Sequence, residues 1–321
     1  MAGADAVRRG VPLVVVASVL AMRTHCFHPR SPVSAVAMYL SLAAASVAGE
    51  PDAWLADCQP PGTLLQWSCG NSFSGGPPGR DEPLASDRPD FTEASTTVGR
   101  GVVQLEMGYT YISDDDGPVH AHAHSYPELL ARIGILAEWL ELRIAFNHAT
   151  QTEDIGPLPA STSSGSEDLY LGFKLALTPQ EGILPEMALM PQWTVPTGHR
   201  AFTADEVLPG LNWLYGWEIN DRFSTAGSTQ INKGIDDAGD TYLELAQSWT
   251  VGISFTDHFG AYTEWFVIGQ SGSAAARTQH YVNGGLVFPV TNDLQFDVRA
   301  GVGLSDASDD FFAGAGLVVR L

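Results

Sequence analysis

The sequence predicts an all-β protein, a transmembrane antiparallel up-and-down β-barrel of about twelve strands. Three observations predict this fold. From Arg100 onward, apolar and polar residues alternate in stretches of about ten residues, and such alternation places the two kinds of side chain on opposite faces of a strand. The stretches are joined by alternately short and long connections, as in outer-membrane barrels. Beyond residue 49, no run of about 18 uncharged apolar residues could form a transmembrane helix, so a membrane crossing requires a closed barrel.

The composition fits a folded protein that does not bind nucleic acid. Apolar residues make up 45% of the 321 residues and aromatic residues 10%, which is enough to bury a large surface. The formal net charge is -21, and Lys174 and Lys233 are the only lysines, whereas nucleic-acid binding needs clustered basic side chains. We therefore expect no nucleic-acid partner.

Residues 1–48 are predicted to be a signal peptide. Two basic stretches each precede an apolar run, at 11–22 and at 33–48, and the second run ends in small residues. We take the second run as the export signal, with Met22 or Met38 as an alternative true start. A short buried helix is the alternative interpretation of this region.

Residues 49–99 are rich in Pro, Gly and Ser, a composition that prevents regular structure. Cys58 and Cys69 remain there after export and are expected to form a local disulfide, with two free thiols as the alternative. No His or further Cys lies at ligand spacing, which disfavours a zinc site. Residues 84–99 place alternating charges around an aromatic residue, and they are expected either to fold back as a plug or to remain a periplasmic tether. The charged residues of this segment are Asp87, Arg88, Asp90 and Glu93.

The barrel is predicted to span residues 100–321. About twelve strands are expected, at 101–112, 126–136, 140–149, 167–177, 186–196, 208–218, 222–233, 241–254, 259–269, 278–289, 294–304 and 311–321. Short connections are expected at 136–139, 178–185, 219–221, 255–258 and 290–293. Longer polar loops are expected at 113–125, 150–166, 197–207, 234–240, 270–277 and 305–310.

The face of the barrel that meets lipid decides where the charged residues lie. A soluble lipocalin-like barrel with an apolar interior is the alternative. Strands of about ten residues suit a tilted membrane crossing, and aromatic residues gather near strand ends, so we expect the apolar row outward. A basic side chain on the lipid face costs about 2–4 kcal/mol at the bilayer midplane, so the charged row is expected to face the lumen. The residues expected to form a lumen constriction are Glu106, Arg132, Glu141, Arg143, Lys174, Glu264, Asp297 and Arg299.

Several stretches resemble a known family of outer-membrane proteins. These are DRPDFTE at 87–93, the following VGRG and QLEMGYTY, HSYPELLARIGI and WLELRIAFN within 124–147, and DLYLGFKLAL at 168–177. Together with looser later matches, they are similar to the family called "putative MetA-pathway of phenol degradation", over about residues 84–321. The resemblance implies a transport barrel, sometimes linked by name to aromatic degradation. The chain departs from the family in ending at Leu321 where an aromatic residue is usual, and in its Cys58–Cys69 segment.

The predicted function is an outer-membrane channel or transporter of a Gram-negative envelope. It would pass small solutes, with aromatic or other hydrophobic compounds as candidates, through a narrow and charged lumen. A structural barrel without transport, whose charges form a salt-bridge network, is the alternative. An outer-membrane lipid hydrolase is less favoured, because neither His280 near Asn283 nor His148 near Asn147 has a Ser beside it in a recognisable motif. We therefore predict that the protein is not an enzyme.

The expected partners are outer-membrane lipid and a small solute, and no cofactor is expected. Acidic residues gather at 114–116, 153–154, 236–240 and 306–310, where they are either solvated or bind divalent cations that bridge lipopolysaccharide. His120, His122 and His124 alternate and could share a strand face as metal ligands. Because they are expected in a loop, no specific role is predicted for them.

Overall fold

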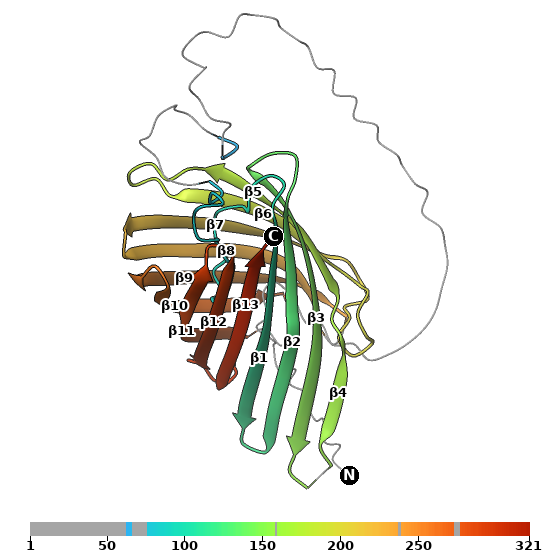
Figure 1. Cartoon of the computed structure of the whole chain (residues 1–321). Coiled ribbons are helices and arrows are strands. Elements are labelled where there is room, and N and C mark those ends of the chain that lie inside the picture. The colour runs from blue at the N-terminus through green and yellow to red at the C-terminus, as the bar shows by residue number, and fades with distance from the viewer. Residues whose placement is uncertain (1–61, 66–75, 158, 237–238, 273–276) are drawn as a thin grey trace, which may run out of the picture.

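The computed structural model describes residues 62–65, 76–157, 159–236, 239–272 and 277–321, and Figure 1 shows the chain. Within these ranges no helix has the length and hydrophobicity of a membrane span. The same ranges contain thirteen strands, which are β1 (Val103–Asp116), β2 (Val119–Gly134), β3 (Leu140–Ile155), β4 (Ser161–Ser166), β5 (Leu169–Thr178), β6 (Glu186–Val195), β7 (Leu208–Asn220), β8 (Phe223–Ile235), β9 (Thr241–Thr256), β10 (Phe259–Ser271), β11 (Thr278–Thr291), β12 (Leu294–Gly303) and β13 (Phe311–Arg320).

The strands close into an antiparallel barrel. Successive strands pair with one another, except β4 with β5, and β1 also pairs with β13, so the first and last strands meet. Strand β3 shares one edge between two partners, because its C-terminal half pairs with β4 and its N-terminal half with β5. Strands β4 and β5 therefore act as two parts of one strand, broken at Glu167 and Asp168. Counted this way the barrel has twelve strands, as the sequence predicts.

The two rims of the barrel differ in their connections. Turns at 221–222, 257–258 and 292–293 lie on one rim, which we call the short-turn rim. Longer connections, such as 196–207 and 304–310, lie on the other, which we call the long-loop rim. In outer-membrane barrels the short turns face the periplasm and the longer loops face outward.

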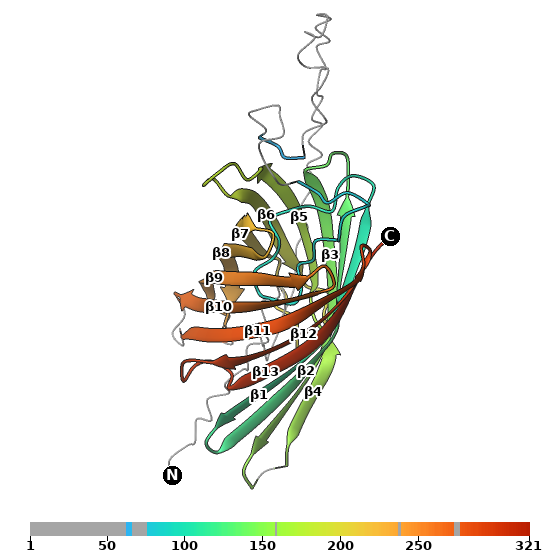
Figure 2. The same ribbon diagram turned by 60° about the vertical axis from the view of Figure 1, so that its left-hand side comes forward.

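Two segments predicted as loops are strands. The sequence predicts polar loops at 113–125 and 150–166, but β1 to β4 extend through most of both segments. Ala121, Ala123 and Ala149 are buried in the apolar cluster of the interior, and the adjacent His122, His124, His148 and Thr150 are more exposed. Figures 1 and 2 show these four strands projecting beyond the others. The prediction was wrong because it followed the polar composition, whereas the period of two continues through both segments.

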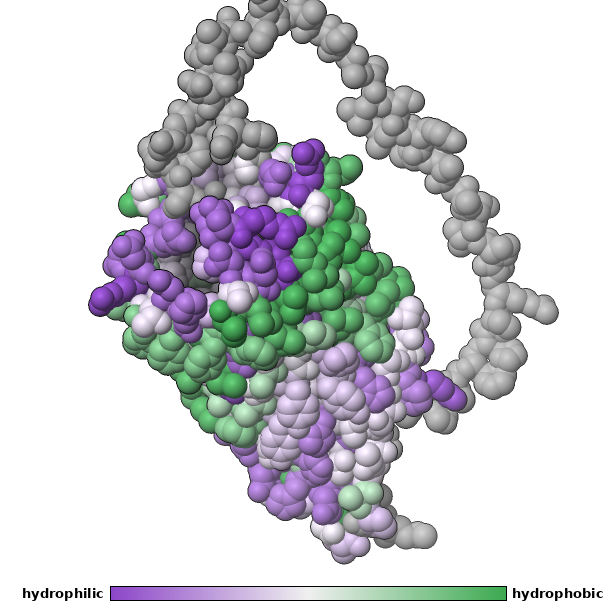
Figure 3. Space-filling view, in the orientation of Figure 1, coloured by the Kyte–Doolittle hydropathy of each residue, from purple (hydrophilic) through white to green (hydrophobic). Residues whose placement is uncertain are grey.

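The outer surface of the barrel wall is apolar. Along β3, the partly exposed Leu140, Leu142 and Ile144 alternate with Glu141 and Arg143, which are 0% exposed. Figure 3 shows apolar residues covering the wall and polar residues on its projecting end. Exposed large apolar side chains on the wall include Phe146, Trp213, Trp249, Trp265, Leu286 and Phe296. The apolar row thus faces outward and the charged row inward, which is the reverse of a soluble lipocalin-like barrel.

Two structures fill the interior. Toward the long-loop rim lies an apolar cluster, to which the connection 196–207 contributes Phe202. We call it the outer cluster, and it consists of Ile112, Ala121, Ala123, Ala149, Phe202, Phe266, Tyr281 and Phe312. Toward the short-turn rim the interior holds residues 84–99, which precede β1 and which we call the inner segment.

Candidate functional site: the inner segment in the lumen

The inner segment begins and ends at the short-turn rim. The amide of Leu84 donates a hydrogen bond to the carbonyl of Asn292 in the β11–β12 turn, at 2.8 Å. At the other end, Gly99 and Gly101 have φ angles of +85° and +78°, which L side chains rarely adopt, and they turn the chain into β1. The chain therefore enters the lumen, reverses and joins the wall at the rim where it entered.

Asp87 binds three basic side chains of the wall. Its carboxylate accepts a hydrogen bond from Lys174 Nζ at 2.8 Å, pairs with Arg143, and lies 3.4 Å from Arg132 Nε. All four side chains are fully buried. Burial by itself would raise the pKa of Asp87, but the charges of Arg132, Lys174 and Arg143 lower it well below its usual range. The carboxylate therefore stays ionised inside the barrel.

Glu93 and Val98 continue the contact with the same side of the wall. Glu93 pairs with Arg143 and accepts a hydrogen bond from Asn212 Nδ2 at 3.1 Å. Burial raises the pKa of Glu93, although the charge of Arg143 acts in the opposite direction. The amide of Val98 donates to Glu141 Oε2 at 2.9 Å. Strands β2, β3 and β5, which carry Arg132, Arg143 and Lys174, thus form a basic side of the lumen.

Arg88 binds two acidic side chains of the wall, Glu128 of β2 and Asp297 of β12. Its Nη1 lies 2.8 Å from Glu128 Oε2, and its Nη2 lies 3.3 Å from Asp297 Oδ1. Gly108 of β1 and Gly316 of β13 are cross-strand partners, and a Cβ atom on them would lie 2.4 Å and 2.1 Å from the guanidinium of Arg88. No side chain other than glycine leaves room for Arg88 at these two positions. The two glycines therefore form a slot in the wall that holds the guanidinium group.

The middle of the inner segment binds β9 and β10. The amides of Phe91 and Thr92 donate to the two carboxylate oxygens of Glu264, at 2.8 and 2.7 Å. The Thr92 hydroxyl also lies 2.6 Å from Ser248 Oγ. The ring of Phe91 stacks on Phe266 of the outer cluster, with ring centroids 4.6 Å apart and an angle of 6° between the planes. This stacking joins the inner segment to the outer cluster.

The eight residues predicted to form a constriction are all buried, and each contacts the inner segment. Six have been described above. Glu106 accepts a hydrogen bond from the amide of Asp87 at 3.2 Å. Arg299 donates to the carbonyl of Pro89 at 2.9 Å. The structure thus brings the predicted wall residues and the charged residues of 84–99 together in one network.

Sequence reasoning placed Glu128 on the lumen face but left it out of the constriction, and it missed Asn212. Glu128 reaches Arg88 because the register of β2 shifts between Tyr126 and Leu129, which changes the residues that face inward. Pro127 within a predicted strand was the available signal, because proline in a strand often marks an irregularity. Asn212 is neutral, and a search for charged side chains passes over it.

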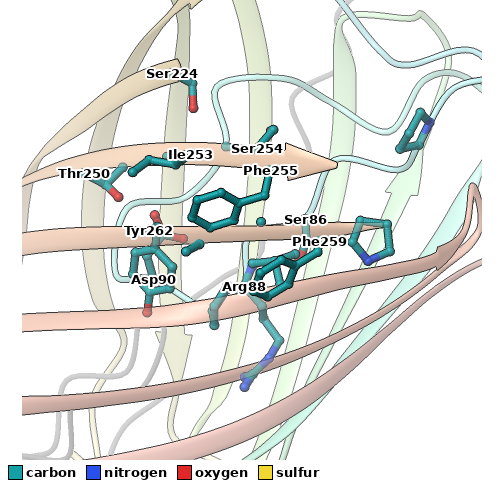
Figure 4. A pocket seen from close by; sticks show the side chains of 18 of the residues that line it. Ser86, Arg88, Asp90, Ser224, Thr250, Ile253, Ser254, Phe255, Phe259 and Tyr262 are labelled. Carbon is teal, nitrogen blue, oxygen red and sulfur yellow. The ribbon is translucent and has the colours of Figure 1, made fainter. Parts of the chain in front are cut away.

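A cavity of about 980 Å³ lies between the inner segment and the wall near the short-turn rim. Small residues on β8 and β9, including Ser224, Ala226 and Gly252, line it and leave space. Figure 4 shows Asp90 and Tyr262 close together at this cavity. Burial, followed by the charge of Glu264, raises the pKa of Asp90 well above its usual range. One face of the inner segment therefore borders open space.

Several predicted sites lie elsewhere. Residues 1–48 and the cysteines Cys58 and Cys69 fall outside the described residues. Within the described ranges, no group of three or more His, Cys, Asp or Glu side chains could hold a metal ion. His120 pairs with Asp115, while His122 and His124 lie in β2, where their rings contact one another. All three histidines therefore lie in strand β2, whereas the sequence had indicated a loop.

The structure gives His148 a neighbouring serine that the sequence did not reveal. Its Nε2 lies 3.0 Å from Ser164 Oγ across the β3–β4 pair. Asn147, the third polar group that the sequence offered, instead donates to Ser125 and Glu167 at 2.8 and 2.7 Å in the interior. Neighbouring residues of a strand point to opposite faces, so Asn147 does not orient His148.

Comparisons with known proteins agree with this architecture. The family described as "Putative MetA-pathway of phenol degradation" matches residues 86–321. Among solved structures, the chain is similar to an outer membrane channel from Pseudomonas putida F1, with 13% identity, a TM-score of 0.54, and coverage of 73% of this chain and 99% of that chain. It is also similar to the translocator domain of the autotransporter NalP from Neisseria meningitidis, with 11% identity, a TM-score of 0.48, and coverage of 70% and 89%. No curated protein matches the sequence.

Proposed function

The chain belongs to the family "Putative MetA-pathway of phenol degradation", whose match spans the whole barrel, and from this premise we propose an outer-membrane channel for small solutes with the inner segment as its plug. One observation carries the proposal. The lumen toward the short-turn rim is filled by a separate segment held through polar contacts, and not by side chains of the wall alone. Displacement of a peptide segment would leave a passage wide enough for a small molecule.

The residues around the plug suit solutes that combine an apolar ring with a polar group. Phe91 covers the face of Phe266, and its departure would leave an aromatic surface in the lumen. Basic side chains such as Arg143 of β3 and acidic side chains such as Asp297 of β12 would then both line the lumen. Opposite charges across a narrow lumen orient a polar or amphipathic solute as it passes. This supports aromatic and other hydrophobic compounds that carry a polar group as solutes.

The second candidate function is a structural outer-membrane barrel in which residues 84–99 stay permanently in place. The buried ion pairs of Asp87, Arg132 and Glu141 favour it, because removing one partner of such a pair is costly. The two functions differ in whether the inner segment moves. Transport requires displacement, and a structural barrel does not.

A reversible cross-link between the inner segment and the wall tests the proposal. Thr92 and Ser248 are suited to it because their side-chain oxygens lie 2.6 Å apart. In a chain whose native cysteines are replaced by serine, Thr92→Cys and Ser248→Cys would form a disulfide that holds the plug in the lumen. We expect liposomes containing the reduced double variant to take up small solutes, and oxidation to stop that uptake.

Each single-cysteine variant serves as the control, because oxidation cannot link its plug to the wall. Both should take up solute at the same rate before and after oxidation. Equal uptake by the oxidised and reduced double variant, with the disulfide verified, would exclude gating by this segment. Failure of the reduced double variant and of both single variants to pass any solute would favour the structural barrel.

A further inference from the structure

The inner segment supplies most of the partners of two wall cations. Lys174 Nζ donates to Asp87 Oδ1 at 2.8 Å and to the carbonyl of Ala94 at 2.7 Å, both in the inner segment. Arg143 pairs with Asp87 and Glu93 of the segment. Its contact with the wall is a hydrogen bond from Nη1 to Glu141 at 3.1 Å. If the segment leaves, Lys174 loses its carboxylate partner, and Arg143 loses two carboxylates and keeps Glu141.

Arg132, the third cation, differs because the wall itself binds it. Its Nε and Nη2 donate to the two oxygens of Glu141 at 2.8 and 3.0 Å, and its Nη1 lies 3.2 Å from Glu106. Among the described residues and without the segment, Arg132 would keep Glu141 and Glu106, Arg143 would keep only the Glu141 that it shares with Arg132, and Lys174 would have no paired carboxylate. Arg143 and Lys174 are therefore the cations that a further carboxylate would neutralise.

Arg143 also has an unused hydrogen-bond donor. Its Nε is buried and has no acceptor among the described residues. Asp87 accepts a hydrogen bond from Nη1 and Glu93 accepts one from Nη2, so the two segment carboxylates bind the guanidinium at separate nitrogens. A free carboxylate could instead accept hydrogen bonds from Nε and Nη2 together, in the bidentate geometry that arginine and carboxylate groups prefer.

We propose that an organic carboxylate binds Arg143 and Lys174 when the inner segment is displaced. In the plugged lumen, the carboxylates of Asp87 and Glu93 occupy the positions where this ligand would bind. This inference rests on the proposed function and identifies the chemical class of a solute that opens the plug. A ligand that binds the displaced state alone shifts the population toward that state. A neutral molecule of the same shape gains no such interaction and leaves the equilibrium where it is.

The cavity provides a route to this site. Glu93 and Ala94, which cover Arg143 and Lys174, also line the cavity at the short-turn rim. A solute in the cavity therefore borders the part of the segment that must move.

The experiment measures how readily a residue of the inner segment becomes exposed. Thr92 is 4% exposed, so a Thr92→Cys chain without its native cysteines should react slowly with a membrane-impermeant maleimide. The full-length protein in liposomes is titrated with benzoate, with benzamide as its neutral counterpart, and with chloride at equal ionic strength. We expect benzoate to accelerate labelling several-fold with saturation, and benzamide and chloride to have no saturable effect.

A second variant assigns the effect to the proposed cations. In Lys174→Met, basal labelling should rise because the segment loses a partner, and the saturable response to benzoate should weaken or vanish. Equal acceleration by benzoate and benzamide, no acceleration by benzoate, or an unchanged benzoate response in Lys174→Met would each overturn the inference. If benzoate does not change the rate of labelling while the cross-link still blocks solute uptake, this inference fails and the proposed function stands.

Discussion

Two buried aspartates, Asp87 in the inner segment and Asp309 in the connection 304–310, ionise in opposite ways. Asp87 lies among three cations, which lower its pKa despite its burial. Asp309 is 2% exposed and accepts a hydrogen bond from the Tyr281 hydroxyl at 3.2 Å. Burial, followed by the charge of Asp114, raises the pKa of Asp309 to about 8. The same residue type is thus charged toward the short-turn rim and largely neutral at the long-loop rim at pH 7.

The difference indicates that the two ends of the lumen respond to different signals. The inner segment is held by ion pairs, which another anion can replace. The connection 304–310 is held at Asp309 by a carboxyl group that must keep its proton, and it is linked to β1 by a 2.9 Å hydrogen bond from the Asp115 amide to Asp310. We therefore expect solutes to act on the first end and pH on the second.

Removing the charge of Asp87 should have the largest effect. Asp87→Asn leaves Arg143 and Lys174 buried without the carboxylate that both contact, and breaking a buried pair in this way costs about 3–5 kcal/mol. We expect that cost to appear as displacement of the inner segment, with maleimide labelling of Thr92→Cys rising by about a hundredfold or more.

The matched control is Glu206→Gln, which removes the charge that pairs with Lys233 at 3.0 Å. The Lys233 and Glu206 side chains are 33% and 49% exposed, and an exposed ion pair contributes about 1 kcal/mol or less. Labelling should then change by less than about fivefold. Similar rates for the two variants would show that the Asp87 cluster does not hold the segment.

The periodicity of the sequence was sufficient to predict the closed barrel and the inward direction of the charged wall residues. The prediction failed at 113–125 and 150–166 because it followed the polar composition of strands that project beyond the barrel. Composition and periodicity disagree in those segments, and periodicity is the feature that the backbone follows. The sequence pattern also could not reveal that β4 and β5 share one edge of β3. That arrangement depends on where the strand that pairs with β3 is interrupted.

The sequence could not predict which residues pair with one another in the lumen. Asp87 and Arg88 are adjacent in the chain, yet Asp87 binds Lys174 of β5 and Arg88 binds Asp297 of β12, which are distant in the sequence. Closure of the barrel sets these neighbours, and no local pattern encodes it. Phe202 joins the outer cluster for a similar reason, because its connection folds inward from a distant part of the chain.

Narrowing the slot around Arg88 should displace the segment less strongly than Asp87→Asn. In Gly316→Ala the new Cβ would lie 2.1 Å from Arg88 Nε, so the guanidinium must move. Overpacking of this kind costs about 1–3 kcal/mol, which corresponds to an increase in Thr92→Cys labelling of about five- to a hundredfold. Gly269→Ala is the matched control, since the nearest atom to its Cβ lies at 3.8 Å. If the two alanine variants label alike, the slot has no role in holding Arg88.

The smallest effect is expected from pH at the long-loop rim. The pKa of Asp309 is about 8 in the folded protein and 3.8 ordinarily, so the folded state binds this proton more tightly than the unfolded state does. The contribution to folding is therefore greatest at low pH and declines as the pH rises from about 4 to about 8. Hydrogen exchange of residues 304–310, corrected for intrinsic rates, should lose protection several-fold between pH 6 and pH 9. Asp309→Asn should keep the same protection at both pH values, and a wild-type loss that persists in this variant would place the titrating group elsewhere.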